Sequence, residues 1–336
     1  MTGATGFLGR HLIEHLLAQG DEVTALVRTF DRARAMPRAV RTWAGDVTRP
    51  AGLRAGVRGA EAVYHLAAAR QPGRRARDLA RLERINLEGT RAVLALAGEV
   101  GAGRVVHVSD LAVHEQSDKG EAPGGGQSQA SEREEQRLRA YVASKRRAHA
   151  AAVGAMRDGV PVTIVCPGAL VGPGDAGWLG RLLGRYARGR LPVMFGGQSA
   201  YSFVSVRDAA AGLRLAAVRG AVGETYDLPG PKLTLRQFLA EAKAATGLPA
   251  PYLWLPAALA RLAGQALGGL RPDLAEAASH YSGHASVGDA GKAERELGWR
   301  AGPLGGALCE AVAWHREQER AAREAAQAAR EPEAGQ

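Results

Sequence analysis

The first half of the chain alternates short apolar runs with amphipathic stretches. The apolar runs predict buried strands, and they cover residues 22–28, 40–44, 62–66, 104–109 and 160–166. Apolar positions at helical spacing predict helices over residues 7–19, 79–99 and 132–156. Strands that alternate with helices favour the α/β class, here a Rossmann-type doubly wound parallel sheet with helices on both faces.

After Pro167 the pattern is less regular and indicates a smaller second lobe. Strands are expected near residues 201–206 and 224–228, and helices over residues 207–218, 235–246 and 256–266. Residues 115–130 are rich in Gly, Ser and Gln, which is typical of a surface loop. Ser131 and Glu134 have the spacing of a capping box at the start of the helix over 132–156.

The C-terminal region, residues 301–336, is expected to hold a helix and a tail. Past Trp314 it is rich in Ala, Glu and Arg and lacks an apolar stripe, which predicts an exposed helix that frays. The apolar segment 251–270 is interrupted by Pro256, Arg261 and Gln265. We expect a core or lid helix there, with at most peripheral membrane contact.

Composition narrows the classes of function. Hydrophobic residues make up 46% of the 336, enough for a sizeable core. The two cysteines, Cys166 and Cys309, are too far apart in sequence to suggest a metal-ligand pattern or a disulfide framework, so no metal site is expected. Without a signal segment or a long apolar run, the expected location is cytoplasmic. The net charge is +10, but Arg is scattered along the chain, and nucleic-acid binding is not expected.

The chain opens with glycines at the spacing GxxGxxG, namely Gly3, Gly6 and Gly9. Glycines there permit a tight turn and let the backbone approach a pyrophosphate, which the N–H groups of the following helix can bind. An ordinary glycine-rich turn is the alternative, because the chain holds 44 glycines. The residues that follow favour a dinucleotide site.

Arg28 ends the next expected strand, and Arg32 lies nearby. An acidic residue at this position would bind the ribose hydroxyls of NAD, whereas an Arg suits the extra phosphate of NADP. Asp46 follows the expected strand over residues 40–44 and could accept a hydrogen bond from the adenine amino group. The expected cofactor is therefore NADP, with NAD as the alternative.

Tyr141 and Lys145 lie four residues apart on an expected helix, so the phenol and the ammonium share one face. A nearby cation favours the phenolate and lowers the pKa of a tyrosine. Such a Tyr can exchange a proton with a substrate oxygen while hydride moves to or from a nicotinamide. A solvated helix face is the alternative interpretation of the same spacing.

Taken together, these motifs resemble the extended short-chain dehydrogenase/reductase family, also called the NAD-dependent epimerase/dehydratase family. The matching segments are TGATGFLG (2–9), GDV (45–47), HLAA (65–68), NLEGT (86–90), YVASK (141–145), PG (167–168), GPGD (172–175), FVSVRD (203–208) and KAERELGW (292–299). Within the family the chain looks most like the dihydroflavonol-reductase-like and hopanoid-associated sugar epimerase groups, in which an Arg after the second strand is usual.

The resemblance implies a dinucleotide domain and a substrate lobe. The expected dinucleotide domain is 1–168, with 201–222 returning to it, and the expected substrate lobe is 169–200 with 223–300. Relatives often form homodimers through the helices expected over 79–99 and 132–156. The expected cofactor contacts are Gly3, Thr5, Gly6, Phe7, Leu8, Gly9, Arg28, Arg32, Asp46, Val47, Leu66, Ala67, Ala68, Asn86, Ser109, Tyr141, Lys145, Pro167 and Gly168. The expected catalytic residues are Tyr141, Lys145 and Asp110.

The chain departs from the family pattern at both ends of this site. The family's first strand, which precedes the glycine motif, is absent, and we interpret Met1 as a misassigned start. Without that central strand, two neighbouring strands would lack hydrogen-bond partners. Asp110 aligns with the family's catalytic Ser or Thr. An ionised carboxylate would repel a developing alkoxide, whereas a protonated one could donate a hydrogen bond but would need a raised pKa. Because neighbours along a strand point to opposite faces, Ser109 is not expected to replace that Ser or Thr.

Other positions separate the chain from particular members of the family. The sugar-nucleotide dehydratases carry Asp-Glu where this chain has Leu111 and Ala112, so a 4,6-dehydratase is not expected. His114 stands where many members have Tyr, and Cys166 where many have Arg. A changed substrate pocket and a tolerated structural exchange both explain these two residues, and we favour the exchange.

Three functions follow from these observations. The first is an NAD(P)-dependent oxidoreductase for a carbonyl/alcohol pair on a small-molecule substrate. The second is a sugar-nucleotide epimerase, which needs the same Tyr, Lys and nicotinamide but returns the cofactor unchanged. The third is a catalytically impaired NADP-binding sensor or scaffold, for which Asp110 is the main argument.

Overall fold

The fold is described from a computed structural model, which covers residues 1–34, 36–49, 52–69, 76–114, 129–191, 193–195, 197–198, 200–256, 259 and 287–328. The loop expected over 115–130 and the helix expected over 256–266 fall almost entirely outside the described residues. Most of the apolar segment 251–270 does so as well.

The main sheet is parallel and consists of two hydrogen-bonded groups of strands. The smaller group pairs β1 (Thr24–Val27) with β2 (Arg41–Ala44). The larger group has the order β3 (Ala62–His65), β4 (Arg104–Val108), β5 (Val162–Pro167) and β9 (Thr225–Leu228). The β-branched runs of β4 and β5 are buried, as expected for strands covered on both faces.

Met1 and Thr2 lie between the two groups. The Met1 carbonyl accepts a hydrogen bond of 2.8 Å from Leu26 N, and Thr2 N donates one of 2.9 Å to the Tyr64 carbonyl. Thr2 forms an isolated parallel bridge with His65. These two residues therefore occupy the central position of the sheet, between β1 and β3, where the sequence predicted that pairing would be incomplete.

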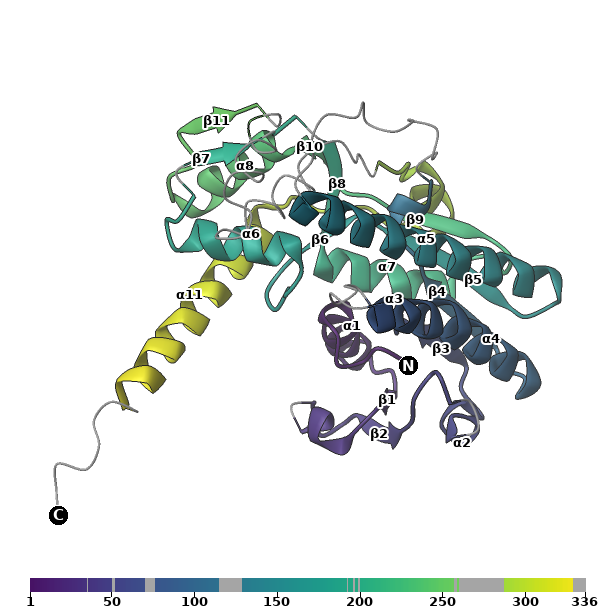
Figure 1. Cartoon of the computed structure of the whole chain (residues 1–336). Helices are drawn as coiled ribbons and strands as arrows, with labels where there is room; N and C mark the ends of the chain where they lie inside the picture. Colours follow the sequence, from purple (N-terminus) through teal and green to yellow (C-terminus); the bar gives the residue numbers. More distant parts are fainter. Residues whose placement is uncertain are drawn as a thin grey trace, which may run out of the picture.

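Helices cover both faces of the sheet, as the doubly wound architecture requires (Figure 1). Helices α1 (Phe7–Ala18) and α7 (Val206–Val218) pack together on one face. Helices α2 (Arg54–Val57), α4 (Gly89–Glu99) and α5 (Gln129–Arg157) lie on the other. Val105 and Val106 are neighbours on β4 but belong to the two different cores, one on each face, which is the alternation expected of a strand.

Two predicted helices differ from the structure. The stretch over 79–99 is divided into α3 (Ala76–Glu83), a π-helical turn, η3 (Arg84–Glu88), and α4. Such turns often occur at functional sites, and this one holds Asn86. Helix α5 begins at Gln129, so Ser131 lies inside the helix and is not its N-cap. The capping-box prediction is wrong because the helix extends past the polar residues that were taken as its start.

The second lobe contains two small sheets. One has the order β10 (Lys232–Thr234), β8 (Ala200–Ser205) and β6 (Ala169–Val171), and the other pairs β7 (Val193–Phe195) with β11 (Leu253–Leu255). Helices α6 (Trp178–Ala187) and α8 (Leu235–Thr246) pack in its apolar core with the start of α11 (Gly305–Ala328). The later part of α11 is exposed and extends away from the body of the molecule (Figure 1).

The lobes divide the chain differently from the predicted boundaries. Strand β9 joins the main sheet, and the π-helical turn η5 (Ala293–Leu297) and Trp299 pack in the core beside α1 and α7, although 223–300 was assigned to the substrate lobe. Conversely, β8 joins the second lobe's sheet. The apolar pattern identifies these elements as strands and helices, but it does not specify which sheet each one joins.

Helices α4 and α5 pack side by side, and a surface depression between them is lined by Leu87, Arg91, Leu94, Ala95, Arg147, Ala150, Ala151, Gly154, Ala155, Asp158 and Val160. A homodimer through these helices stays a prediction. Among the described residues, no helix combines the length and the apolar character needed to cross a membrane.

Candidate active site

The glycine turn is built by close backbone contacts. Gly3 has φ +70°, and a Cβ there would lie 2.6 Å from the carbonyl carbon of Leu66. A Cβ on Gly9 would lie 2.3 Å from the carbonyl oxygen of Gly3. Both contacts are with backbone atoms that cannot move aside, so a side chain is excluded at Gly3 and at Gly9. The two glycines therefore let the turn, the start of α1 and the end of β3 pack closely, the arrangement found in dinucleotide-binding turns.

Helix α1 begins at Phe7 immediately after this turn. Its N-cap residue, Gly6, has extended backbone and supplies no side chain to the first N–H groups, and the first turn holds no acidic residue. The first backbone bond back to the turn comes from Arg10 N to the Gly6 carbonyl, at 3.1 Å. The N-terminal end of α1 therefore has N–H groups without side-chain caps and a positive dipole end, the features of a helix terminus suited to an anion.

Arg28 and Asp46 lie close together because β1 and β2 are parallel neighbours and both residues follow the carboxyl ends of these strands. Burial acts to raise the pKa of Asp46, but hydrogen bonds from Thr48 N and Thr48 Oγ1, at 2.9 and 2.8 Å, together with the charges of Arg28 and Arg49, lower it on balance. Asp46 is therefore an anchored carboxylate. Arg28 is exposed, and Arg32 lies on the short helix η1 (Phe30–Ala33), where its side chain is outside the described part.

His65 connects the glycine turn to the helices behind it. Thr90 Oγ1 donates to the Asn86 carbonyl at 2.6 Å, so His65 Nε2 must donate to Thr90 Oγ1 at 2.9 Å. Burial, reinforced by the nearby Lys145 ammonium, lowers the pKa of His65 to about 3, so the ring is neutral and its Nδ1 accepts from Thr2 Oγ1 at 2.8 Å. Hydrogen-bond geometry thus assigns the tautomer of a residue that the sequence did not select.

Asn86 continues this row of hydrogen bonds into the catalytic helix. Its side chain bonds both the N–H and the carbonyl of Ala69, at 2.7 and 3.1 Å, which fixes the backbone after β3. Its Nδ2 also donates to Ser144 Oγ at 2.9 Å, and Ser144 donates to the Tyr141 carbonyl at 2.7 Å. Asn86 was expected to contact the cofactor, and the structure places it as a bridge between that region and α5.

Tyr141 and Lys145 both reach the carboxyl end of β4. The Tyr141 hydroxyl donates to Asp110 Oδ2 at 3.4 Å, and the buried Lys145 Nζ donates to the Val108 carbonyl at 2.9 Å. Asp110 Oδ1 accepts from Ala112 N at 3.0 Å, which starts the short helix η4 (Leu111–His114). The structure therefore brings the three expected catalytic residues into one place.

Ser109 also turns toward α5, where its hydroxyl lies 3.0 Å from His149 Nδ1. We expected Ser109 and Asp110 to face opposite sides, but both contact side chains of the same helix. The reason is that β4 ends at Val108, and the strict alternation of a strand does not continue beyond it. Ser109 nevertheless has its own partner and does not occupy the position beside Tyr141.

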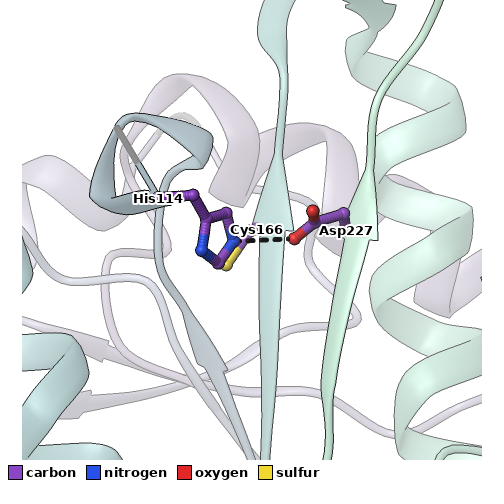
Figure 2. A group of neighbouring side chains, drawn as sticks. All are labelled: His114, Cys166 and Asp227. Carbon is purple, nitrogen blue, oxygen red and sulfur yellow. Dashed lines mark hydrogen bonds and ion pairs between the residues drawn. The ribbon is translucent and has the colours of Figure 1, made fainter. Parts of the chain in front are cut away.

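The sequence also failed to single out a polar cluster next to this site, formed by His114, Cys166 and Asp227 (Figure 2). His114 Nε2 lies 3.0 Å from Asp227 Oδ1. Burial, with the nearby Asp227 carboxylate, raises the pKa of the Cys166 thiol, and Ser109 hydrogen-bonds to it. A signal for Asp227 was available, because it is the polar residue near the end of an apolar strand in a parallel sheet, where ligands bind.

The remaining expected cofactor residues lie along the carboxyl edge of the sheet or on the glycine turn. Gly168 follows β5, and its N–H donates to the Leu228 carbonyl at 3.1 Å. The others occupy the turn and start of α1, the ends of β2 and β3, and the end of β5: Thr5, Leu8, Val47, Leu66, Ala67, Ala68 and Pro167. Parallel α/β sheets bind ligands at this edge, beside the point where the strand order reverses.

The chain is similar in sequence to known proteins. A model of the NAD-dependent epimerase/dehydratase family matches residues 1–228. A putative dihydroflavonol 4-reductase of Synechocystis sp. is 32% identical over 326 residues, covering 94% of this chain and 93% of the relative. Sterol demethylase protein B of Methylococcus capsulatus is 32% identical over 332 residues, covering 94% and 98%.

A solved structure of another protein with a similar fold contains a bound cofactor. It is a double mutant of dTDP-glucose 4,6-dehydratase from Streptomyces venezuelae with NAD bound, 25% identical, with a TM-score of 0.70 over 94% of this chain and 96% of that one. The fold, the glycine turn and the family match lead to one conclusion: this chain belongs to the NAD-dependent epimerase/dehydratase family, whose members are Rossmann-fold enzymes.

Proposed function

We propose that this protein is a nicotinamide-dependent oxidoreductase that reduces a carbonyl to an alcohol, with Tyr141 as the proton donor. The observation that carries the proposal is the meeting of Tyr141, Lys145 and Asp110 at the end of β4, on the edge of the sheet that also bears the glycine turn. A bound nicotinamide would supply the hydride. Residues of the chain would donate the proton and stabilise the charge that develops.

Tyr141 and Lys145 have separate tasks in this proposal. The Tyr141 hydroxyl gives its proton to the oxygen that becomes the alcohol. Lys145, held by the Val108 carbonyl at 2.9 Å, stands one helical turn from Tyr141 and stabilises the negative charge that the phenol oxygen gains. Because Lys145 is buried, its charge acts in a poorly screened environment and has a stronger effect than at the surface.

Asp110 orients the proton donor. Its carboxylate accepts a hydrogen bond of 3.4 Å from the Tyr141 hydroxyl and stabilises the protonated phenol, the form that donates a proton. This contact does not set the direction of hydride transfer, because a catalyst accelerates both directions of a reaction. The name of one relative, a putative dihydroflavonol 4-reductase, favours net reduction over sugar-nucleotide epimerisation for this chain.

We further propose NADP as the preferred cofactor. Arg28 lies after the carboxyl end of β1, beside the anchored carboxylate of Asp46, where the extra phosphate of NADP would lie. Asp46 is held by Thr48 and would accept a hydrogen bond from the adenine amino group. The names of the two curated relatives refer to a flavonoid and a sterol, which favours a polycyclic, largely apolar carbonyl substrate for this chain.

The test replaces Tyr141 by Phe and follows the consumption of NADPH with a dihydroflavonol or a 3-keto steroid as the probe. We expect the rate to fall by about 100- to 10,000-fold, because the general acid is lost, while NADPH binding is retained. Tyr252→Phe is the matched control, since that side chain is 81% exposed. Unchanged turnover in Tyr141→Phe would overturn the mechanism. NADPH binding without turnover on any probe in the natural protein would favour the sensor or scaffold.

A further inference from the structure

We propose that His114, Cys166 and Asp227 form a binding site for one Zn²⁺ ion beside the catalytic residues. Their ligand atoms lie within 4.8 Å of one another (Figure 2). The site is distinct from the nicotinamide chemistry, and it can be tested without cofactor or substrate. The sequence predicted no metal site because these residues come from three distant segments of the chain.

Sheet register explains why Cys166 and Asp227 meet. They are Cα partners in the parallel pair of β5 and β9, so their side chains leave the same face of the sheet side by side. His114 comes from the helix η4 at the end of β4, the next strand along. Asp110 caps that helix through Ala112 N at 3.0 Å, which fixes the direction in which His114 leaves it.

The donor set suits a transition metal rather than Mg²⁺ or Ca²⁺. Zinc binds thiolate, imidazole and carboxylate, whereas the alkaline-earth ions take oxygen ligands alone. A thiolate and a carboxylate also neutralise the two charges of the ion, and the imidazole binds as a neutral ligand. Three protein ligands leave one tetrahedral position open, the arrangement of catalytic rather than structural zinc sites.

The distances are compatible with one shared ion. Tetrahedral zinc, with bonds of about 2.0 Å to N and O and about 2.3 Å to S, places its ligand atoms about 3.3 to 3.6 Å apart. His114 Nε2 and Asp227 Oδ1 are separated by 3.0 Å, and the thiol is the fully buried member of the set. The His114 side chain is 40% exposed, so it can turn by the small amount that coordination requires.

Neighbouring groups support the ligands. Ser109 hydrogen-bonds to Cys166 and lies 3.0 Å from His149 Nδ1, and the His149 ring packs edge-on against His114 at 6.0 Å. Gly288 closes the site on the side of Asp227, where an added Cβ would lie 3.1 Å from its carboxylate. Such outer contacts hold ligands in orientation and raise metal affinity.

The experiment uses the full-length protein without an affinity tag, stripped by a chelator and then titrated with Zn²⁺ or Co²⁺. We expect one ion per chain by elemental analysis, and a thiolate-to-cobalt charge-transfer band with tetrahedral visible bands. Cys166→Ser should abolish the charge-transfer band and weaken binding by more than about 100-fold. Asp227→Asn should weaken binding and keep the band. Cys309→Ser, at the other, exposed cysteine, should change neither.

Circular dichroism of each variant establishes that it is folded before its metal content is compared. His114→Asn alters an exposed ligand on a short helix and provides a second test should Cys166→Ser fail to fold. The proposal is wrong if the folded natural protein takes up less than one equivalent, or if Cys309→Ser abolishes the band while Cys166→Ser leaves it. Loss of turnover in Tyr141→Phe has no bearing on these results, so the two proposals fail separately.

Discussion

Single residues decide which charges meet the substrate and the cofactor. Asp110 places a carboxylate 3.4 Å from the phenol of Tyr141, at the position where the sequence resemblance leads one to expect a hydroxyl. Arg28 places a cation at the opposite end of the dinucleotide site, beside Asp46. In the proposed function, Asp110 therefore affects the proton step and Arg28 the choice of cofactor.

Replacing Arg28 by Ala should weaken NADPH binding by about 10- to 100-fold, because charge-assisted hydrogen bonds contribute about 1.5 to 3 kcal/mol. NADH lacks the extra phosphate, so its affinity should change little. Fluorescence titration with each cofactor measures both effects. Arg34→Ala is the matched control, an exposed Arg nearby that pairs with Asp31 at 3.3 Å. Equal weakening of NADPH and NADH would contradict the proposed role.

At the scale of single residues, the sequence indicated which side chains would gather at the site, but not the contacts that each of them makes. Tyr141 and Lys145 could be found because their spacing on a helix is itself a chemical pattern. The role of Asn86 could not be found, because its partners Ala69 and Ser144 are brought to it by the fold. The same holds for His65, whose tautomer depends on Thr2 and Thr90.

Helices and strands were predicted correctly where a single hydrophobic periodicity continues along the whole segment. Helix α8 (Leu235–Thr246) has the bounds that were expected, with a capping box at Thr234 and a left-handed Gly247 to end it. Helix α6 (Trp178–Ala187) was not predicted, although its buried residues Leu179, Leu182, Leu183 and Tyr186 follow helical spacing. The Gly- and Pro-rich approach to α6 hid this pattern. The π-helical turn at Asn86 has no comparable sequence signal.

Helix α11 should divide into a structural half and a dispensable half. Leu308 is fully buried in the core that α11 shares with α6 and α8, so Leu308→Ala should lower the free energy of unfolding by about 2 to 5 kcal/mol. Arg320→Ala, in the exposed half, removes only an ion pair with Glu324 at 3.8 Å and should cost less than about 0.5 kcal/mol. Urea denaturation compares the two, and similar losses would contradict this division.

At the scale of the whole molecule, side chains from distant segments come together because they lie at the ends of neighbouring strands. The type of sheet was predictable, since strands that alternate with helices form a parallel sheet. The cluster of His114, Cys166 and Asp227 was not, because it depends on β4, β5 and β9 being neighbours. The expectation that β9 belongs to the substrate lobe was wrong for the same reason, because β9 pairs with β5 in the main sheet and sheet membership is a property of packing.

Two buried histidines make the stability of the whole molecule depend on pH. Burial and Lys145 lower the pKa of His65 to about 3, and burial, His65 and Lys145 lower that of His107 well below its usual value. Both are neutral in the folded protein but bind protons in the unfolded chain below about pH 6.5. Their contribution is complete above about pH 6.5 and is lost as the pH falls below it, down to about pH 3 in the case of His65, at up to about 1.4 kcal/mol per pH unit for each.

In the variant His107→Leu, the free energy of unfolding should change less steeply with pH. The slope should fall by up to about 1.4 kcal/mol per pH unit, the share of one histidine. Both ring nitrogens of His107 are buried without a hydrogen-bond partner, so leucine removes no bond. Urea denaturation at several pH values from about 7 to about 4 measures the slope. An identical slope in the variant and the natural protein would show that His107 does not take part.

The row of hydrogen bonds from Thr2 through His65, Thr90, Asn86 and Ser144 to the Tyr141 carbonyl connects the start of the glycine turn with α5. Its members come from four separate segments of the chain, and each holds the next in a buried position. A substitution at one member therefore removes a hydrogen bond from a neighbour in another segment, so its effects are not confined to the residue that is replaced.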